Sequence, residues 1–251
     1  MLSGKAPAGK HIPNGLFWET KRPYHYMRSY TSPDGQMLVV GGEDHPSGTS
    51  VDTRPYFDRL QRYAHKKFGI EEVHSRWSAQ YFNAADDVPY IGKAPLSRNL
   101  FVATGFSGTG LTFGTVAALL LTSLVLGKKH VWAHVYRPSR ISLPALGKLV
   151  KFGITNAKHV LLDRFAAAAA GKPEDLAAGE GRIMKVAGKK MAVYKDASGK
   201  VCKLSPICTH AGCVVQFNSA EGTWDCPCHG SRFSGEGKVL FGPAVEDLRP
   251  L

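Results

Sequence analysis

The sequence predicts an α+β protein whose C-terminal part is a small all-β domain. Residues 180–251 hold short apolar runs separated by glycine-containing turns, as small antiparallel β domains do. Residues 100–121 read as a buried strand, a glycine-rich turn and the start of a helix. We therefore divide the chain into a first domain over 1–140, a helical linker over 141–179 and the β domain over 180–251.

Charge and composition narrow the function classes. The chain has 251 residues, enough for one or two domains with proper cores, and a net charge of +12. Residues 1–170 hold 21 Lys/Arg and 11 Asp/Glu, so the basic excess lies there. No nucleic-acid motif accompanies it. We expect an acidic partner, an anionic substrate or cofactor phosphates, and no nucleic acid.

In the first domain, Leu100–Thr104 is predicted to be a strand, 105–110 a turn and 111–126 a helix. A helix that starts after a glycine turn offers backbone N–H groups to an anion. Glycines that only allow tight packing are the alternative. The helix has sixteen residues, including Gly114 and three threonines, so we expect a buried helix and no transmembrane segment.

The linker repeats apolar residues at near-helical spacing, with lysines between them. Such a segment could lie on a membrane surface, but packing of its apolar face on the first domain is the favoured interpretation. Three strands are expected after it, and Cys202 is interpreted as a strand thiol without a role. The expected strands are Ile183–Val186, Met191–Tyr194 and Val201–Leu204, and Gly222–Asp225 leads into the second Cys/His pair.

Two Cys/His pairs form the strongest signal in the chain. Cys208-Thr-His210 is followed by Cys226-Pro-Cys-His229. Thiolate and imidazole bind borderline-soft metals, and close pairing lets each loop present two ligands. Zinc is one interpretation; the residues around the pairs favour another.

The stretches Cys208–Cys213 and Cys226–Ser231 resemble the two cluster-binding loops of the Rieske family, over about residues 180–251. The resemblance implies a [2Fe–2S] cluster with Cys208 and Cys226 on one iron and His210 and His229 on the other. It also implies a Cys213–Cys228 disulfide and a Ser231 hydroxyl that donates to a cluster sulfur. Phe233 stands where high-potential members have Tyr, which should lower the potential.

A second resemblance covers the first domain. Tyr24–Arg28, Val39–His45, Arg76–Ser78, Asp87–Gly92 and Ala103–Phe106 are similar, in this order, to the C-terminal half of FAD-dependent oxidoreductases of the glycine oxidase and D-amino acid oxidase type. This implies a substrate carboxylate held by Arg28 with Tyr26, although Arg28 could instead be a surface strand residue. Tyr81 and His25 are weaker candidates. The implied flavin-binding positions are Gly105, Ser107, Gly108, Gly110, Leu111 and Thr112.

One family element is not found. No Rossmann unit with Gly-x-Gly-x-x-Gly precedes Tyr24. We therefore expect the chain to be the C-terminal part of a longer protein, with FAD bound in the full-length form and no oxidase activity by this chain alone.

The two resemblances together predict an oxidoreductase that passes electrons from flavin-linked oxidation of a small amine or amino acid to the Rieske cluster, and then to a redox protein or other acceptor. A Rieske electron-transfer module on a non-catalytic scaffold is the alternative. A quinol-oxidising respiratory subunit is disfavoured, because no N-terminal anchor is visible. We expect a cytoplasmic location, where a structural disulfide would be unusual.

Overall fold

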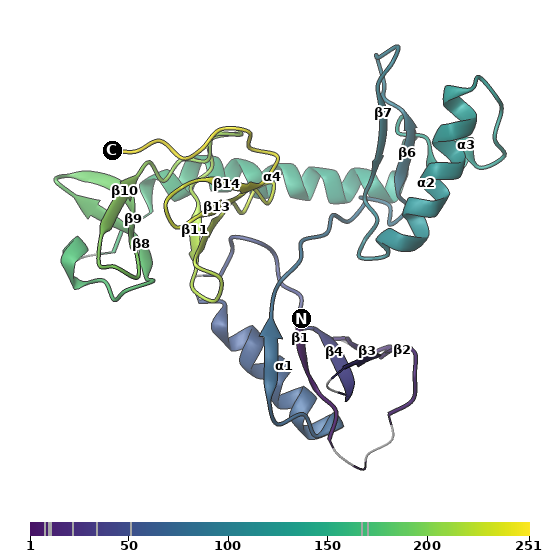
Figure 1. Ribbon diagram of the computed structural model, residues 1–251. Helices are drawn as coiled ribbons and strands as arrows, with labels where there is room; N and C mark the ends of the chain where they lie inside the picture. Colours follow the sequence, from purple (N-terminus) through teal and green to yellow (C-terminus); the bar gives the residue numbers. More distant parts are fainter. Residues whose placement is uncertain are drawn as a thin grey trace. The chain divides into compact units, whose positions relative to one another are not determined.

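The computed structural model describes residues 1–7, 9, 12–21, 23–33, 35–50, 52–166, 168–169 and 171–251 (Figure 1). The chain forms two compact units. The first combines Met1–Ala79 with Lys158–Leu251, and the second is Gln80–Ala157. Each unit is described by itself.

In the first unit, residues 1–79 form an antiparallel sheet in the order β2-β3-β4-β1-β5, with helix α1 (Arg54–Phe68) packed on one face. Side chains alternate between the faces of a strand. Met27 and Val40 therefore face Leu60 and Ala64 of the helix in a buried core, while Tyr26 and Arg28 project from the other face. The strands are β1 (Leu2–Lys5), β2 (Leu16–Trp18), β3 (His25–Ser32), β4 (Gly35–Gly42) and β5 (Val73–Arg76).

The rest of the first unit contains the two small sheets of the C-terminal domain. Their order is β10-β9-β8 and β11-β12-β13-β14, and all pairs are antiparallel. Trp224 and Phe233 are fully buried in the core, next to the cysteines of the metal motif. The elements are η1 (Pro173–Asp175), β8 (Gly181–Val186), β9 (Lys189–Lys195), β10 (Val201–Leu204), β11 (Gln216–Asn218), β12 (Thr223–Asp225), β13 (Arg232–Ser234) and β14 (Val239–Phe241). The three expected strands are confirmed as β8, β9 and β10.

The second unit contains the hairpin β6 (Tyr90–Lys93) and β7 (Phe101–Thr104), helix α2 (Gly110–Val125) and the short α3 (Ala133–Tyr136). The strand, turn and helix expected over residues 100–126 are confirmed. The expectation of a buried helix is wrong for most of α2. Ala117 and Leu120 are buried against Ile91, but Leu111 is 90% and Leu119 54% exposed. A two-stranded hairpin covers only one stripe of the helix.

Helix α4 (Leu143–Phe165) confirms a helix in the linker. On this helix Leu146, Leu149, Val150 and Leu161 are all more than half exposed. Val160 packs against the core of the C-terminal domain. Within the described part of the chain, no helix is long and apolar enough to cross a membrane.

A buried ion pair between Arg140 and Asp86 stabilises the second unit. Arg140 donates two hydrogen bonds of 2.6 Å to the two oxygens of Asp86, and both side chains are about 90% buried. The guanidinium also donates to the carbonyls of Val88 and Pro89 and lies 3.9 Å over the Tyr90 ring. Hydrogen bonds from Arg140 hold the pKa of Asp86 below its usual range.

Replacing Arg140 by Met should destabilise the second unit by about 3 kcal/mol, because it leaves a buried carboxylate without its partner. The loss of stability is measured by urea unfolding that is monitored through the hydrogen exchange of β6 and β7. Arg98→Met, at an exposed arginine in the same unit, is the matched control and should change stability by less than about 0.5 kcal/mol. Equal effects of both variants would contradict the role of the pair.

Candidate metal centre and candidate flavin-binding residues

Two loops of the C-terminal domain fold with the same hydrogen-bond pattern. In the first loop, the Cys208 N–H donates to Cys213 O (2.8 Å) and the Gly212 N–H to Cys208 O (3.1 Å). In the second, the Cys226 N–H donates to Ser231 O (2.8 Å) and the Gly230 N–H to Cys226 O (3.1 Å). Both glycines have a φ near +75°, which non-glycine residues rarely adopt. Each loop thus presents one cysteine and one histidine from an equivalent tight turn.

The two cysteines of the metal motif meet at the buried side of the loops. Cys208 and Cys226 are each 2% exposed, and their sulfur atoms are hydrogen-bonded to each other. This contact lowers the pKa of Cys208 to about 6 and raises that of Cys226. One proton shared between two buried sulfurs indicates a place where a cation would replace it.

The two histidines meet on the outer side. The imidazole rings of His210 and His229 lie with their centroids 4.9 Å apart and nearly perpendicular. His210 is exposed and His229 partly exposed. Burial and the neighbouring His210 lower the pKa of His229, which favours the neutral form that binds metals. The structure therefore brings together all four residues predicted as ligands, with thiols inside and imidazoles outside.

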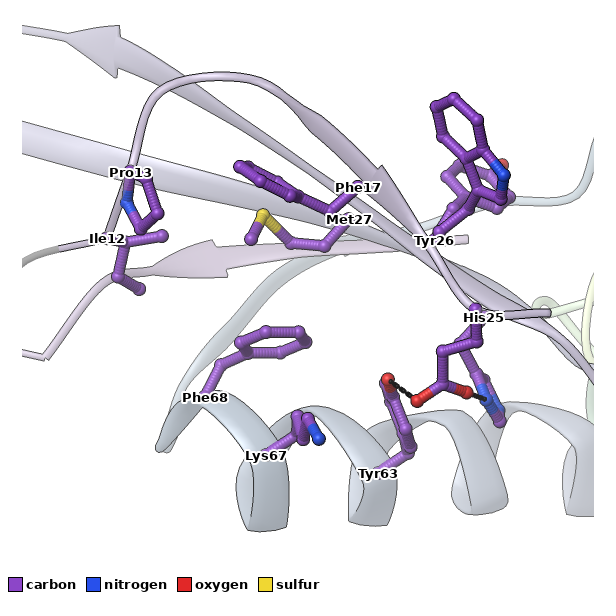
Figure 2. A pocket seen from close by; sticks show the side chains of 11 residues that line it. Ile12, Pro13, Phe17, His25, Tyr26, Met27, Tyr63, Lys67 and Phe68 are labelled. Carbon is purple, nitrogen blue, oxygen red and sulfur yellow. Dashed lines mark hydrogen bonds and ion pairs between the residues drawn. The ribbon is translucent and has the colours of Figure 1, made fainter. Parts of the chain in front are cut away.

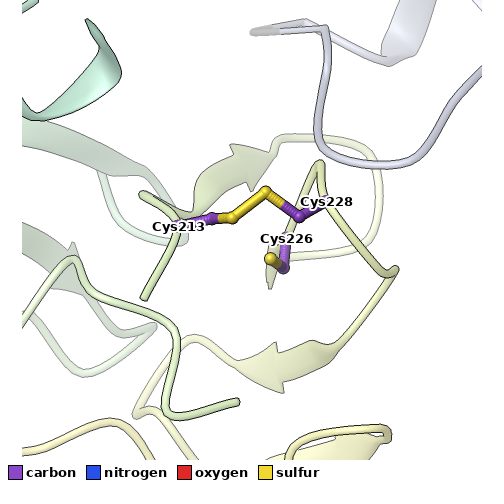
Figure 3. A group of neighbouring side chains, drawn as sticks. All are labelled: Cys213, Cys226 and Cys228. Carbon is purple, nitrogen blue, oxygen red and sulfur yellow. A yellow bond between two sulfur atoms is a disulfide. The ribbon is translucent and has the colours of Figure 1, made fainter. Parts of the chain in front are cut away.

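A disulfide joins the loops. Cys213 and Cys228 are bonded, as the Rieske resemblance implied. The sulfur atoms of Cys213, Cys226 and Cys228 lie within 4.8 Å of one another (Figure 3), but two of these sulfurs are in the disulfide and cannot act as thiolates. Cys202 is a partly buried free thiol in β10, as expected.

Ser231 is fully buried beside the thiols. Its hydroxyl oxygen accepts a hydrogen bond of 3.0 Å from the Ala244 N–H, and the hydroxyl is hydrogen-bonded to the Cys208 sulfur. Phe233 is fully buried in the core and has no hydroxyl to offer a cluster.

Replacing Ser231 by Ala should lower the reduction potential of a cluster bound here, because a donor to sulfur stabilises the more negative reduced state. Protein-film voltammetry measures the shift. Ser234→Ala, in β13 but outside the loop, is the control and should leave the potential unchanged. An unaltered potential in Ser231→Ala would show that this hydroxyl does not act on the cluster.

The open face of the β1–β5 sheet carries the two predicted substrate residues. Tyr26 and Arg28 stand two residues apart on β3 and share that face, where Arg28 is exposed. The Tyr26 ring lies directly over Gly41, where a Cβ would come within 2.1 Å of it. His25 points to the opposite, helix-facing side of the sheet, away from Arg28.

His25 instead borders a pocket of about 380 Å³ between β2, β3 and α1 (Figure 2). It is stacked on the Tyr63 ring at 3.8 Å, and its Nδ1 lies 3.2 Å from Glu19. The Tyr63 hydroxyl donates to Glu19 at 2.9 Å. Hydrogen bonds from Tyr63 and His25 lower the pKa of Glu19, while burial and the Glu19 contact raise that of Tyr63 to about 12.

The predicted flavin-binding turn lies in the second unit, and its glycines differ in how much space surrounds them. A Cβ at Gly105 would come within 3.1 Å of Ala84, so this glycine serves packing. A Cβ at Gly108 or Gly110 would meet nothing within 4 Å. The Ser107 N–H donates to Phe82 O at 3.1 Å. The N–H groups of Gly110, Leu111 and Thr112 precede the first hydrogen bond of α2, from the Phe113 N–H to Thr109 O. Tyr81, 40% exposed, lies in the same unit.

Two Cys/His loops joined by a disulfide within a small antiparallel β domain are the arrangement expected of an iron–sulfur domain. Residues 167–251 match the Rieske [2Fe-2S] domain family, and residues 2–124 match the family described as FAD dependent oxidoreductase. The chain therefore contains one region similar to each of these two families, with the FAD-dependent oxidoreductase region first. The Rieske domain implies a [2Fe–2S] cluster, and the other domain implies FAD.

Similar proteins share one or both parts. The chain is 35% identical over 248 residues to YhfW of Bacillus subtilis (strain 168), named as a Rieske 2Fe-2S iron-sulfur protein; the match covers 95% of this chain and 47% of YhfW. It is 45% identical over 58 residues to the chloroplastic cytochrome b6-f complex iron-sulfur subunit of Pisum sativum, covering 23% of this chain and 25% of that protein. The chain thus spans about half or less of these curated relatives.

Among solved structures, the cyanobacterial plasma membrane Rieske protein PetC3 from Synechocystis PCC 6803 is 38% identical. That match covers 28% of this chain and 72% of PetC3, with a TM-score of 0.26.

Proposed function

We propose that this oxidoreductase transfers electrons through a [2Fe–2S] cluster held by Cys208, Cys226, His210 and His229. The observation that supports it most is the convergence of two buried thiols and two outer imidazoles. Thiolates suit an inner iron, and neutral imidazoles suit an outer iron whose reduction they make easier. The exposed ring of His210 is the edge through which an external redox protein would exchange electrons.

We further propose that the electrons come from a flavin-linked oxidation. Arg28 would bind the carboxylate of a small amino acid or related amine through a charge-assisted hydrogen bond, with the Tyr26 hydroxyl beside it. Burial raises the pKa of Tyr26, so its hydroxyl stays protonated as a donor. The N–H groups of Gly110, Leu111 and Thr112 suit an electron-rich part of FAD. FAD, when bound, would supply the capacity to accept a hydride, and the cluster the capacity to accept single electrons.

Arg28→Ala tests the substrate assignment in a protein that also contains the predicted dinucleotide-binding half. The KM for the substrate should rise at least about 100-fold while flavin stays bound. Arg62→Ala, at an exposed arginine of α1, is the matched control and should leave the KM unchanged. A KM unaltered in Arg28→Ala would remove Arg28 from substrate binding.

Flavin binding itself separates the proposal from the alternative of a non-catalytic scaffold. FAD needs contacts along its whole length, and one turn offers few of them. Residues 1–251 should therefore bind FAD weakly, and a protein with the predicted Rossmann half should bind it tightly, as measured by titration calorimetry. Submicromolar affinity for residues 1–251 would contradict this placement of the site. No FAD binding by the longer protein would favour the scaffold.

A further inference from the structure

Within the first unit, a buried polar network connects residues 1–79 to the C-terminal domain. The Thr53 hydroxyl donates to the Asn218 side-chain oxygen at 2.5 Å, and both residues are about 95% buried. Thr53 occupies the N-cap position of α1, yet its side chain makes no cap hydrogen bond. It serves Asn218, and accepts from the Ala220 N–H at 3.1 Å, instead of stabilising its own helix. Next to it, the Ser219 hydroxyl donates to Asp52 at 2.7 Å.

A second group of contacts lies at Ser78. Its N–H donates to Glu221 at 3.1 Å and its hydroxyl to the other oxygen of the same carboxylate. Arg232 donates to Glu221 at 2.7 Å and to Asp225 at 3.0 Å. Asn218 donates to the remaining oxygen of Asp225 at 3.0 Å, which joins both groups into one network.

This network borders the second cluster loop. Asp225 immediately precedes Cys226, and Arg232 immediately follows Ser231. Gly48 touches the loop backbone: a Cβ there would lie 2.6 Å from Pro227 N, 2.7 Å from Asp225 O and 2.8 Å from Cys226 C. Its φ is +67°. Gly48 thus makes a backbone approach that no other residue type allows.

We propose that Gly48, Asp52, Thr53 and Ser78 form a docking site that holds the C-terminal domain in one fixed orientation on residues 1–79. The partner of this site is the chain's own hairpin β11–β12 and second cluster loop. Gly48 contacts the backbone of the second cluster loop, whereas His210 lies on the first loop and is exposed, which leaves it accessible to an external redox partner. The buried hydrogen bonds of Asn218 with Thr53 and Asp225 have fixed directions, which suits this role better than apolar contacts that allow one surface to shift over the other.

A distance measurement between two spin labels tests the proposal. Nitroxides are attached at Lys66→Cys on α1 and Lys185→Cys on β8, both exposed, in a Cys202→Ser background. The full chain with its cluster is used, which protects the other cysteines. Double electron–electron resonance should give a single narrow distance distribution. This readout requires no flavin and no turnover, so it stands apart from the proposed electron transfer.

Gly48→Ala should broaden the distribution severalfold and speed hydrogen exchange of residues 216–225 by about tenfold, because the added methyl group meets loop backbone. Gly188→Ala is the matched control, since Gly188 has a φ of +79° but open space around it; the distribution should stay narrow. Ser78→Ala, which adds no atoms, should broaden it too, and remains informative if Gly48→Ala does not fold. A broad distribution in the parent, or a narrow one in both Gly48→Ala and Ser78→Ala, would overturn the proposal.

Discussion

Replacing Cys226 by Ser is expected to abolish cluster binding and to unfold much of the C-terminal domain. The Cys226 sulfur is 2% exposed and in hydrogen-bond contact with Cys208, so its loss removes one of two inner ligands. Binding of a structural metal ion contributes about 10 kcal/mol or more to the folding of zinc-finger peptides, and loss of one ligand forfeits part of such a term. Since net stabilities are about 5–15 kcal/mol, losing even part of this term is severe.

Iron and acid-labile sulfide analysis after anaerobic reconstitution measures the first effect, and near-UV circular dichroism the second. Cys202→Ser is the matched control, because Cys202 is a free, partly buried thiol in β10 outside both loops. It should retain iron and sulfide in full. A Cys226→Ser protein that keeps a full complement of both would contradict the ligand assignment.

Replacing Arg232 by Met is expected to destabilise the C-terminal domain by about 3 kcal/mol. The Arg232 side chain is 13% exposed and pairs with Asp225 (7% exposed) and Glu221 (20% exposed). Met fills similar volume but leaves two carboxylates without their cation. Arg182→Met removes an arginine that is 54% exposed and paired with Glu180, and should change stability by less than about 1 kcal/mol. Similar losses in both variants would contradict the role of burial.

Arg232→Met should also make the C-terminal domain less stable in acid. Burial pushes the pKa of Glu221 upward, but hydrogen bonds from Ser78 and the charge of Arg232 outweigh it and hold this pKa below the ordinary 4.5. A lowered carboxyl pKa gives stability above about pH 4.5 that is lost as the pH falls through the folded-state pKa. Without Arg232, the pKa of Glu221 should rise, and acid unfolding should begin at a higher pH.

Much of the local structure could be predicted because it is encoded locally. The strands of the C-terminal domain follow short apolar runs between turns, and the helix α2 follows a glycine turn. The metal motif could also be predicted from the sequence, because each Cys/His pair lies within one loop. The hairpin β11–β12 joins the two loops. Side-chain alternation on β3 also separates His25 from Arg28, a distinction that the sequence could have supplied.

The docking network could not be predicted from the sequence. Thr53 and Asn218 are 165 residues apart, and no periodicity or spacing links them. One signal was available: Thr53 precedes Arg54-Pro55 at a helix start, where a threonine normally caps its own helix, and the structure uses it elsewhere. The extent of α2 burial was missed because burial depends on the size of the neighbouring sheet, and β6 and β7 have only four residues each.

The most direct test of the central claim is the number of histidine nitrogens bound to the reduced cluster. Electron–nuclear double resonance on protein labelled with ¹⁵N-histidine should show two coordinated nitrogens. His210→Cys should show one, with a lowered reduction potential, because a charged thiolate replaces a neutral imidazole. Stoichiometric zinc without iron or labile sulfide, or a cluster signal with no coupled histidine nitrogen, would contradict a Rieske centre at Cys208, His210, Cys226 and His229.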